Sequence, residues 1–141
     1  MLDMSGDRIR VKAGLDDLAR VRAFVERHAH AAGLSQDGAA ELVLAVDEAV
    51  SNCLEHGLRG DKGEIEVRVE PQRNALRVII RDNAARFDPT RAPATHLALS
   101  PLDRAKPGGF GLELMNRLVD GIDYRVTGDG LNELSLLKRR T

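Results

Sequence analysis

The chain is short of cysteine, of aromatic residues and of long apolar runs, and each shortage restricts what the protein can be. The single cysteine, Cys53, cannot form a disulfide within the chain, which excludes the framework of small disulfide-rich secreted domains. No stretch approaches the roughly 20 apolar residues that a membrane-spanning helix requires, and the polar N-terminus shows no signal peptide. We therefore expect a cytoplasmic protein with no membrane segment.

An excess of one charge is also missing. The 141 residues include 21 Lys and Arg and 22 Asp and Glu, which gives a net charge of −1. This balance creates no field directed at nucleic acid or at anionic lipid. Hydrophobic residues make up 43% of the chain but aromatic residues only 3%, so the core must consist mainly of aliphatic side chains. The length fits a single domain over residues 1–141.

The first half of the chain carries the pattern of a strand and two helices. Alternation of apolar and charged residues over 8–13 predicts a short edge strand. Apolar residues at three- and four-residue steps predict an amphipathic helix over 15–32, which Gly33 would end. Ser35 is positioned to cap a second helix from Gln36 to about Glu55. The apolar face expected for this helix comprises Leu42, Val43, Val46, Ala49, Val50, Cys53 and Leu54.

The second half carries the pattern of two hairpins separated by a long loop and a helix. The expected elements are strands over 64–70 and 76–81 with a turn at 71–74, a proline-rich loop over 83–109, a helix over 110–119, and strands over 122–127 and 133–138. Grouped strands and grouped helices indicate a two-layer α+β sandwich, in which a mainly antiparallel mixed sheet carries three helices on one face.

A polar stripe runs along the second predicted helix. Glu48, Asn52 and His56 are four residues apart and therefore share one side of the helix. A carboxylate one turn from an amide can hold Mg²⁺ and orient a hydroxyl beside a phosphate, because Asn supplies a neutral oxygen ligand and Glu accepts a proton. Taken alone, this spacing is more typical of a solvated face of an amphipathic helix, which is the alternative interpretation.

An aspartate follows the second strand of the first hairpin. Asp82 at this strand end can accept a hydrogen bond from an exocyclic amine such as that of adenine. By itself, Asp82-Asn83 also fits an ordinary turn.

A glycine turn precedes the third predicted helix. The run Gly108-Gly109-Phe110-Gly111-Leu112 lets the backbone approach a ligand closely, and it presents N–H groups at the positive end of a helix to phosphate oxygens. A flexible hinge is the alternative. The chain has no Gly-x-x-x-x-Gly-Lys-Ser/Thr motif, so a P-loop is excluded.

The order of these motifs resembles the Bergerat-type ATP-binding fold of the GHKL superfamily, which is shared by gyrase, Hsp90, MutL and histidine kinases. Within that superfamily, the chain looks most like the serine-protein-kinase anti-sigma factors (RsbW-like) of bacterial partner-switching systems. The resemblance spans nearly the whole chain. It implies that the chain binds ATP and Mg²⁺. It also implies that the loop from about residue 86 to residue 109 forms the ATP lid.

The resemblance also implies roles for single residues. Glu48 matches the general base of the family, Asn52 its magnesium ligand and Asp82 its adenine-recognising aspartate. Gly109 and Gly111 match the glycines that close over the triphosphate. The whole turn, residues 108–112, is therefore expected to contact the nucleotide.

One position departs from the pattern of the family. The adenine box of the family reads Asp-x-Gly, and here Ala84 stands in place of that glycine. Alanine adds a methyl group where the backbone passes close to the base, and it resists positive φ. We expect the site to bind nucleotide even though Ala84 replaces this glycine, with Ala84 itself close to the base.

The resemblance implies an ATP-dependent protein serine/threonine kinase that also acts as an anti-sigma-type regulator. Its expected partners are a small STAS-type anti-sigma-factor antagonist, which it phosphorylates, and a sigma factor or equivalent regulator, which it sequesters. Neither nucleic acid nor a membrane is an expected partner. Dimerisation is common in that group, so a homodimer is kept as an alternative to a monomer.

Two other functions stay open on the sequence. One is a nucleotide-dependent protein-binding module without significant kinase activity, for which Ala84 is the supporting feature. The other is the catalytic domain of a histidine kinase separated from its phosphoacceptor helices.

Overall fold

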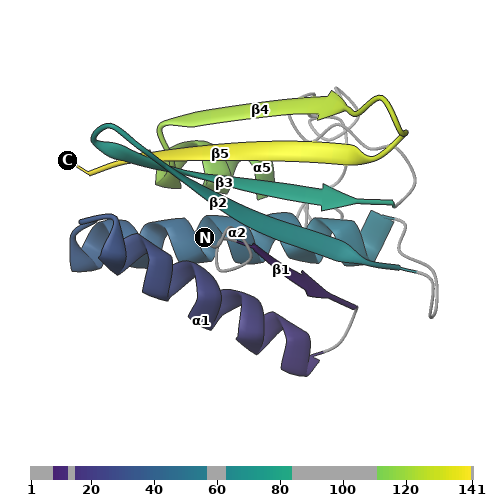
Figure 1. Ribbon diagram of the computed structural model, residues 1–141, viewed down its shortest axis with the longest axis horizontal. Helices are drawn as coiled ribbons and strands as arrows, with labels where there is room; N and C mark the ends of the chain where they lie inside the picture. The colour runs from purple at the N-terminus through teal and green to yellow at the C-terminus, as the bar shows by residue number, and fades with distance from the viewer. Residues whose placement is uncertain (1–7, 13–14, 57–62, 84–110, 141) are drawn as a thin grey trace, which may run out of the picture.

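The computed structural model describes residues 8–12, 15–56, 63–83 and 111–140, which form one sheet covered by helices (Figure 1). The elements in chain order are β1 Arg8–Val11, α1 Leu15–Ala31, α2 Gln36–His56, β2 Ile65–Gln72, β3 Ala75–Asp82, α5 Gly111–Leu118, β4 Gly121–Val126 and β5 Asn132–Arg139. The five strands have the spatial order β1-β2-β3-β5-β4, and all four pairings are antiparallel. The α+β class is confirmed. The described sheet is wholly antiparallel, however, where a mixed sheet was expected.

Helix α1 ends at a glycine, as the sequence predicts. Gly33 has a φ of 88°, and the N–H of Leu34 donates to the carbonyl of Ala29 at 3.1 Å. The Gly33 N–H donates to the carbonyl of His30 at 3.0 Å, which completes a Schellman motif. The left-handed conformation reverses the chain within a few residues, so α2 packs back against α1.

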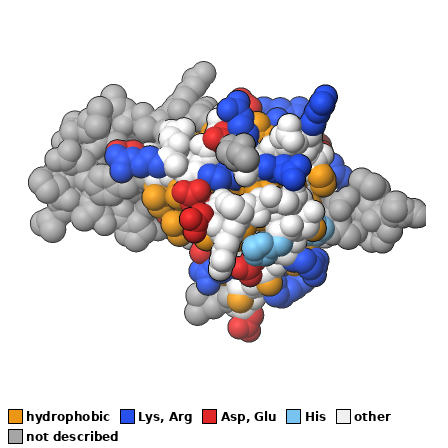
Figure 2. All heavy atoms as spheres, turned by 90° about the vertical axis from the view of Figure 1, so that its left-hand side faces the viewer, with side chains coloured by type: hydrophobic (Ala, Val, Ile, Leu, Met, Phe, Trp, Pro, Cys, Tyr) orange, Lys and Arg blue, Asp and Glu red, His pale blue; other side chains and the backbone are white. Residues whose placement is uncertain are grey.

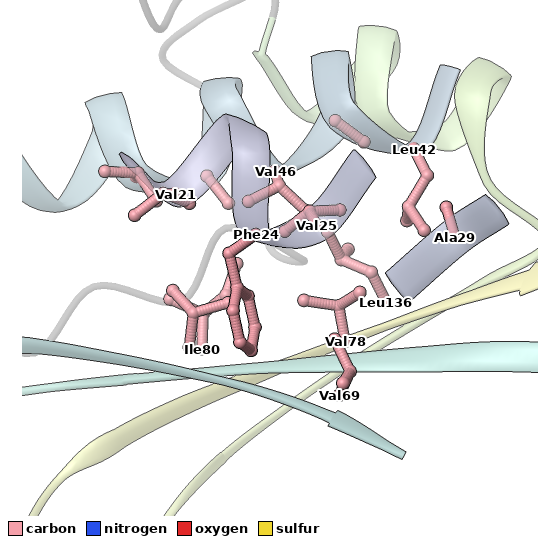
Figure 3. Close-up of a cluster of buried hydrophobic side chains, with 14 of the residues drawn as sticks. Val21, Phe24, Val25, Ala29, Leu42, Val46, Val69, Val78, Ile80 and Leu136 are labelled. Carbon is pink, nitrogen blue, oxygen red and sulfur yellow. The ribbon is translucent and has the colours of Figure 1, made fainter. Parts of the chain in front are cut away.

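Helix α2 begins at the predicted cap and covers the sheet. The hydroxyl of Ser35 accepts a 3.0 Å hydrogen bond from the N–H of Gly38, which satisfies one of the unpaired N–H groups of the first turn. Residues of the predicted apolar face, such as Leu42 and Val46, lie in the core together with Val25 of α1 and Leu136 of β5 (Figure 3). One cluster therefore joins the helices to one face of the sheet.

The hairpin turn between β2 and β3 is shorter than predicted. Strand β2 continues through Gln72, which pairs with Ala75, so only Arg73 and Asn74 form the turn instead of residues 71–74. Asn74 adopts a φ of 62°, a conformation that asparagine tolerates better than most residues. The exposed Pro71 fits within the strand near its end.

Charged side chains cross the open face of the sheet in one continuous row. Each strand contributes one residue at matching register, and the signs alternate through Arg10, Glu66, Arg81, Glu133 and Arg125. The nitrogens of Arg81 and Arg125 lie 2.6 and 2.5 Å from the carboxylate of Glu133. Burial opposes ionisation of Glu133, but the hydrogen bonds and charges of Arg125 and Arg81 outweigh it and lower the pKa of this carboxyl. The row therefore stabilises the register of β3, β5 and β4 from the side away from the helices.

The surface at the end that holds the β2–β3 turn and the α1–α2 connection is mixed in character. Figure 2 shows positive, negative and apolar side chains interspersed there, without a continuous field of one kind. None of the helices in the described part of the chain combines the length and the apolar character needed to cross a membrane.

Replacing Gly33 with alanine tests the left-handed end of α1. A Cβ atom there would lie 2.9 Å from Nε of Arg140, a flexible side chain that can move, so the cost comes mainly from the φ of 88°. We expect Gly33→Ala to lower the free energy of unfolding by about 1–2 kcal/mol in urea titrations. Gly128→Ala is the matched control, because no atom lies within 4 Å of its added Cβ. Equal losses in the two variants would contradict the assignment.

Candidate functional site

The candidate site residues lie where three elements meet at one end of the molecule. Helix α2 and strand β3 both finish at the right-hand end in Figure 1, and β5 begins there. Asn52 and Cys53 lie in the last turns of α2, and Asp82 is the last residue of β3. The fold therefore brings together two predicted motifs that lie about thirty residues apart in the sequence.

Asp82 is a buried carboxylate with donors on two sides. Its side chain is 6% exposed. The Sγ–H of Cys53 donates to Oδ2 at 3.0 Å, and Nδ2–H of Asn132 donates to Oδ1 at 3.0 Å. Both donors are neutral groups, so the negative charge of Asp82 is held by hydrogen bonds from α2 and from β5.

Asn52 and Glu48 form the polar side of α2. Asn52 is only 7% exposed, and its Oδ1 has no hydrogen-bond partner among the described residues. Leaving such an acceptor unpaired costs about 1–3 kcal/mol, so buried polar atoms without a partner are rare in native structures. The unpaired Oδ1 therefore calls for an explanation, such as a bound ion. Glu48, one turn earlier, is half-buried. A buried, unpartnered amide oxygen beside a carboxylate fits Mg²⁺, which prefers hard oxygen ligands.

Cys53 contacts both the apolar core and a polar residue of the candidate site. It was expected as a small core residue, and it does pack against the core, but its thiol also contacts the Asp82 carboxylate. Burial and then the neighbouring negative charge and hydrogen bond of Asp82 raise the pKa of this thiol well above its usual range. The thiol therefore stays protonated at neutral pH and acts as a hydrogen-bond donor.

The glycine turn lies only partly within the described residues. Gly111 is the first residue of α5 and Leu112 the second, whereas Gly108, Gly109 and Phe110 lie outside the described ranges. Helix α5 packs against α2 and runs in the opposite direction, so its positive N-terminal end is directed towards the end of the molecule where Asp82 lies (Figure 1).

The remaining predictions on the loops also fall outside the described residues. Ala84 and the expected lid over 86–109 belong to this part of the chain. Their proposed contacts with a nucleotide stay predictions. Among the predicted polar residues, the described part of the chain thus places Asn52 near the end of α2 and Asp82 at the end of β3, with Glu48 one helical turn before Asn52.

Two polar residues of the site were missed in the sequence. Asn132 lies opposite Asp82 in the β3–β5 pairing and is also buried, at 6% exposed. The hydroxyl of Tyr124, on β4, donates to Oδ1 of Asn132 at 2.5 Å. The only signal available was their position in the second hairpin, because the register between strands 50 residues apart cannot be read from local patterns.

The chain is similar in sequence to curated protein kinases. The chain is 38% identical over 96 residues to the serine/threonine-protein kinase BtrW of Bordetella bronchiseptica; the match covers 67% of this chain and 66% of BtrW. It is 26% identical over 117 residues to the serine-protein kinase RsbW of Bacillus thuringiensis, covering 81% of this chain and 73% of that protein. These names confirm the resemblance to the serine-kinase group.

The fold is also similar to that of a solved structure containing the RsbU and RsbW domains of Rv1364c from Mycobacterium tuberculosis. The TM-score is 0.60 at 18% identity, and the similarity covers 94% of this chain and 32% of that one. At this identity the likeness concerns the fold alone. The family model described as the histidine kinase-like ATPase domain matches residues 11–138, nearly the whole sequence. The chain therefore belongs to the histidine kinase-like ATPase domain family.

Proposed function

We propose that this chain is an ATP-dependent protein serine/threonine kinase and anti-sigma-type regulator that acts in the cytoplasm in a bacterial partner-switching system. It phosphorylates a small STAS-type antagonist protein on serine or threonine. It sequesters a sigma factor or an equivalent regulator when the antagonist is phosphorylated. The names of the curated relatives support the kinase activity, and the polar residues Glu48, Asn52 and Asp82 are the groups to which the proposal assigns this chemistry.

The observation that carries the proposal is the unpartnered Oδ1 of Asn52, one helical turn beyond Glu48. A structural asparagine with this burial would normally be hydrogen-bonded. The chain belongs to a family of ATPase domains, and in such a domain an unpaired acceptor near a carboxylate is available to coordinate Mg²⁺ when the nucleotide binds. Mg²⁺ held there would neutralise charge on the phosphates during transfer.

The buried Asp82 carboxylate recognises the base. In this proposal it accepts a hydrogen bond from the exocyclic amine of adenine, which a carboxylate does well because it is an acceptor only. The glycine turn, residues 108–112, approaches the phosphates with its backbone N–H groups. Together these contacts orient the triphosphate of ATP, the substrate, towards Glu48.

Glu48 is the proposed general base. The carboxylate accepts the proton from the Oγ–H of the substrate serine as that oxygen attacks the γ-phosphorus and the bond to the β-phosphate oxygen breaks. Phosphoryl transfer needs little covalent participation from the protein, so positioning of the serine and this proton transfer are its main tasks.

A nucleotide-dependent binding module without significant kinase activity is the second candidate. The feature that favours it is Ala84, which replaces the glycine of the adenine box. In such a module, ATP would alter partner affinity by shifting a conformational equilibrium without phosphate transfer. Transfer of labelled phosphate to a partner protein separates the two candidates.

ATP binding with Mg²⁺ present tests the nucleotide site. We expect the wild type to bind ATP in calorimetry and Asp82→Asn to bind at least about tenfold more weakly, because the amide offers one acceptor oxygen and introduces a donor facing the amine. Asp123→Asn, an exposed change on β4, is the control and should bind like the wild type. Absence of binding to the wild type would refute the proposed ATP site.

Glu48→Ala tests the base. Transfer of labelled phosphate from ATP to a purified STAS-type antagonist of the same organism should fall by about 10²–10⁴-fold, while ATP affinity changes little. Glu41→Ala serves as control, because Glu41 lies on the same helix and pairs with Lys138. If Glu48→Ala phosphorylates the antagonist at the wild-type rate, Glu48 is not the base.

Asn52→Leu tests whether the unpaired oxygen serves a ligand. Removing a buried acceptor without a partner should raise the free energy of unfolding of the nucleotide-free protein by about 1 kcal/mol. The same variant should lose the magnesium-dependent part of ATP affinity. Asn116→Leu, at an exposed position of α5, should change neither quantity by much. A destabilised Asn52→Leu protein that still binds MgATP would contradict the magnesium assignment.

A further inference from the structure

The carboxylate of Asp82 is held by donors from two different layers of the fold. Cys53 reaches its Oδ2 from the helix layer, and Asn132 reaches its Oδ1 from the neighbouring strand β5. The two donors contact different oxygens, at 3.0 Å each. Asp82 and Asn132 are also direct partners in the sheet, so the backbone itself sets their spacing.

Two donors on two oxygens fix the plane of a carboxylate. The last torsion of an aspartate side chain is broad, so one hydrogen bond leaves the group free to rotate about its own axis. A second bond to the other oxygen, from a different direction, removes that freedom. The orientation in which Asp82 meets a ligand therefore depends on Cys53 and Asn132 together.

Asn132 is in turn fixed by Tyr124. The phenol donates to Oδ1 of Asn132 at 2.5 Å, which leaves the NH₂ group of the amide facing Asp82. The order of hydrogen bonds is thus Tyr124 to Asn132 to Asp82, across β4, β5 and β3. The phenol therefore favours the orientation in which the amide presents its NH₂ group, and not its oxygen, to the carboxylate.

We propose that Cys53, Asn132 and Tyr124 are positioning residues that hold the Asp82 carboxylate for an adenine amine and thereby set the preference of the site for ATP over GTP. This inference rests on the proposed function, in which Asp82 accepts the hydrogen bond of the base. It adds three residues that act through Asp82, and one of them is the only cysteine of the chain.

The chemistry of the two bases explains why orientation matters. Adenine carries an amine at position 6, whereas guanine carries a carbonyl oxygen there. A carboxylate directed at this position bonds the amine and repels the carbonyl, because both oxygens are acceptors. A site that positions a polar group for one base discriminates strongly, and discrimination declines when that group can rotate away. Loosening Asp82 should therefore weaken ATP binding and leave GTP binding unchanged or stronger.

The test compares the dissociation constants of MgATP and MgGTP in the wild type and in four variants. Cys53→Ala, Asn132→Ala and Tyr124→Phe should each lower the ratio of the GTP constant to the ATP constant, by about tenfold for the first two and about threefold for Tyr124→Phe. Cys53→Ser restores a donor at the same position, so its ratio should return towards that of the wild type. Thermal unfolding checks that each variant is folded.

Ser135→Ala is the matched control. It deletes a hydrogen bond with Arg77 from the opposite face of β5, and it should leave the ratio unchanged. If Asn132→Ala fails to fold, Tyr124→Phe still decides, since it removes a single oxygen atom.

The outcomes separate this inference from the proposed function. Wild-type protein that binds MgATP, with variants whose ratio equals that of the wild type, overturns the positioning role and leaves the nucleotide site standing. If the variants bind MgATP and MgGTP more weakly by the same factor, these residues have only a structural role, and this outcome also overturns the positioning role. Wild-type protein that binds neither nucleotide overturns the proposed function and this inference together.

Discussion

The packing of α2 on the sheet is the contact on which the rest of the molecule depends. One side of this helix is buried against β3 and β5, and it contributes Leu42, Val46 and Val50 to the core. A helix has a fixed angular spacing of side chains, so burying that side determines where Glu48 and Asn52 lie. The hydrophobic interaction that stabilises the fold is therefore also what places the polar residues of the site.

A second consequence of this packing is the position of Cys53. The residue lies at the border between the apolar and polar sides of α2, so it can contact the core and the carboxylate of Asp82. A larger apolar residue would fill the same border but could not donate a hydrogen bond. A charged residue would be costly to bury. A thiol meets both conditions because it is small, weakly polar and a donor.

Much of the architecture could be predicted from the sequence because its elements are strongly patterned. The period-two alternation of β2, the glycine stop of α1 and the serine cap of α2 are local signals, and each is confirmed by the structure. Their ends were placed less well, as in the hairpin where the strands continue to Gln72 and Ala75. Local patterns mark turns but do not state how far strand pairing extends into them.

The residues of the site could be predicted only in part, because local patterns do not reveal which strands pair or in what register. Glu48 and Asn52 share a helix, so their spacing predicts that they lie together. Asn132 could not be found in this way, because its relation to Asp82 depends on the pairing of strands that are 50 residues apart. The role of Cys53 was likewise hidden, since its spacing in α2 indicates only a border position.

The β3–β5 register is fixed on both faces of the sheet by neighbouring residues. Arg81 pairs with Glu133 on the open face, and Asp82 pairs with Asn132 on the face that the helices cover. A slip of one residue would reverse every side chain of one strand and break both pairs at once. Loops of the protein can therefore gain or lose residues during evolution. An insertion or deletion within β3 or β5 would instead disrupt the fold and the site together. Related sequences should accordingly align without gaps through these two strands, even where little else in them is shared.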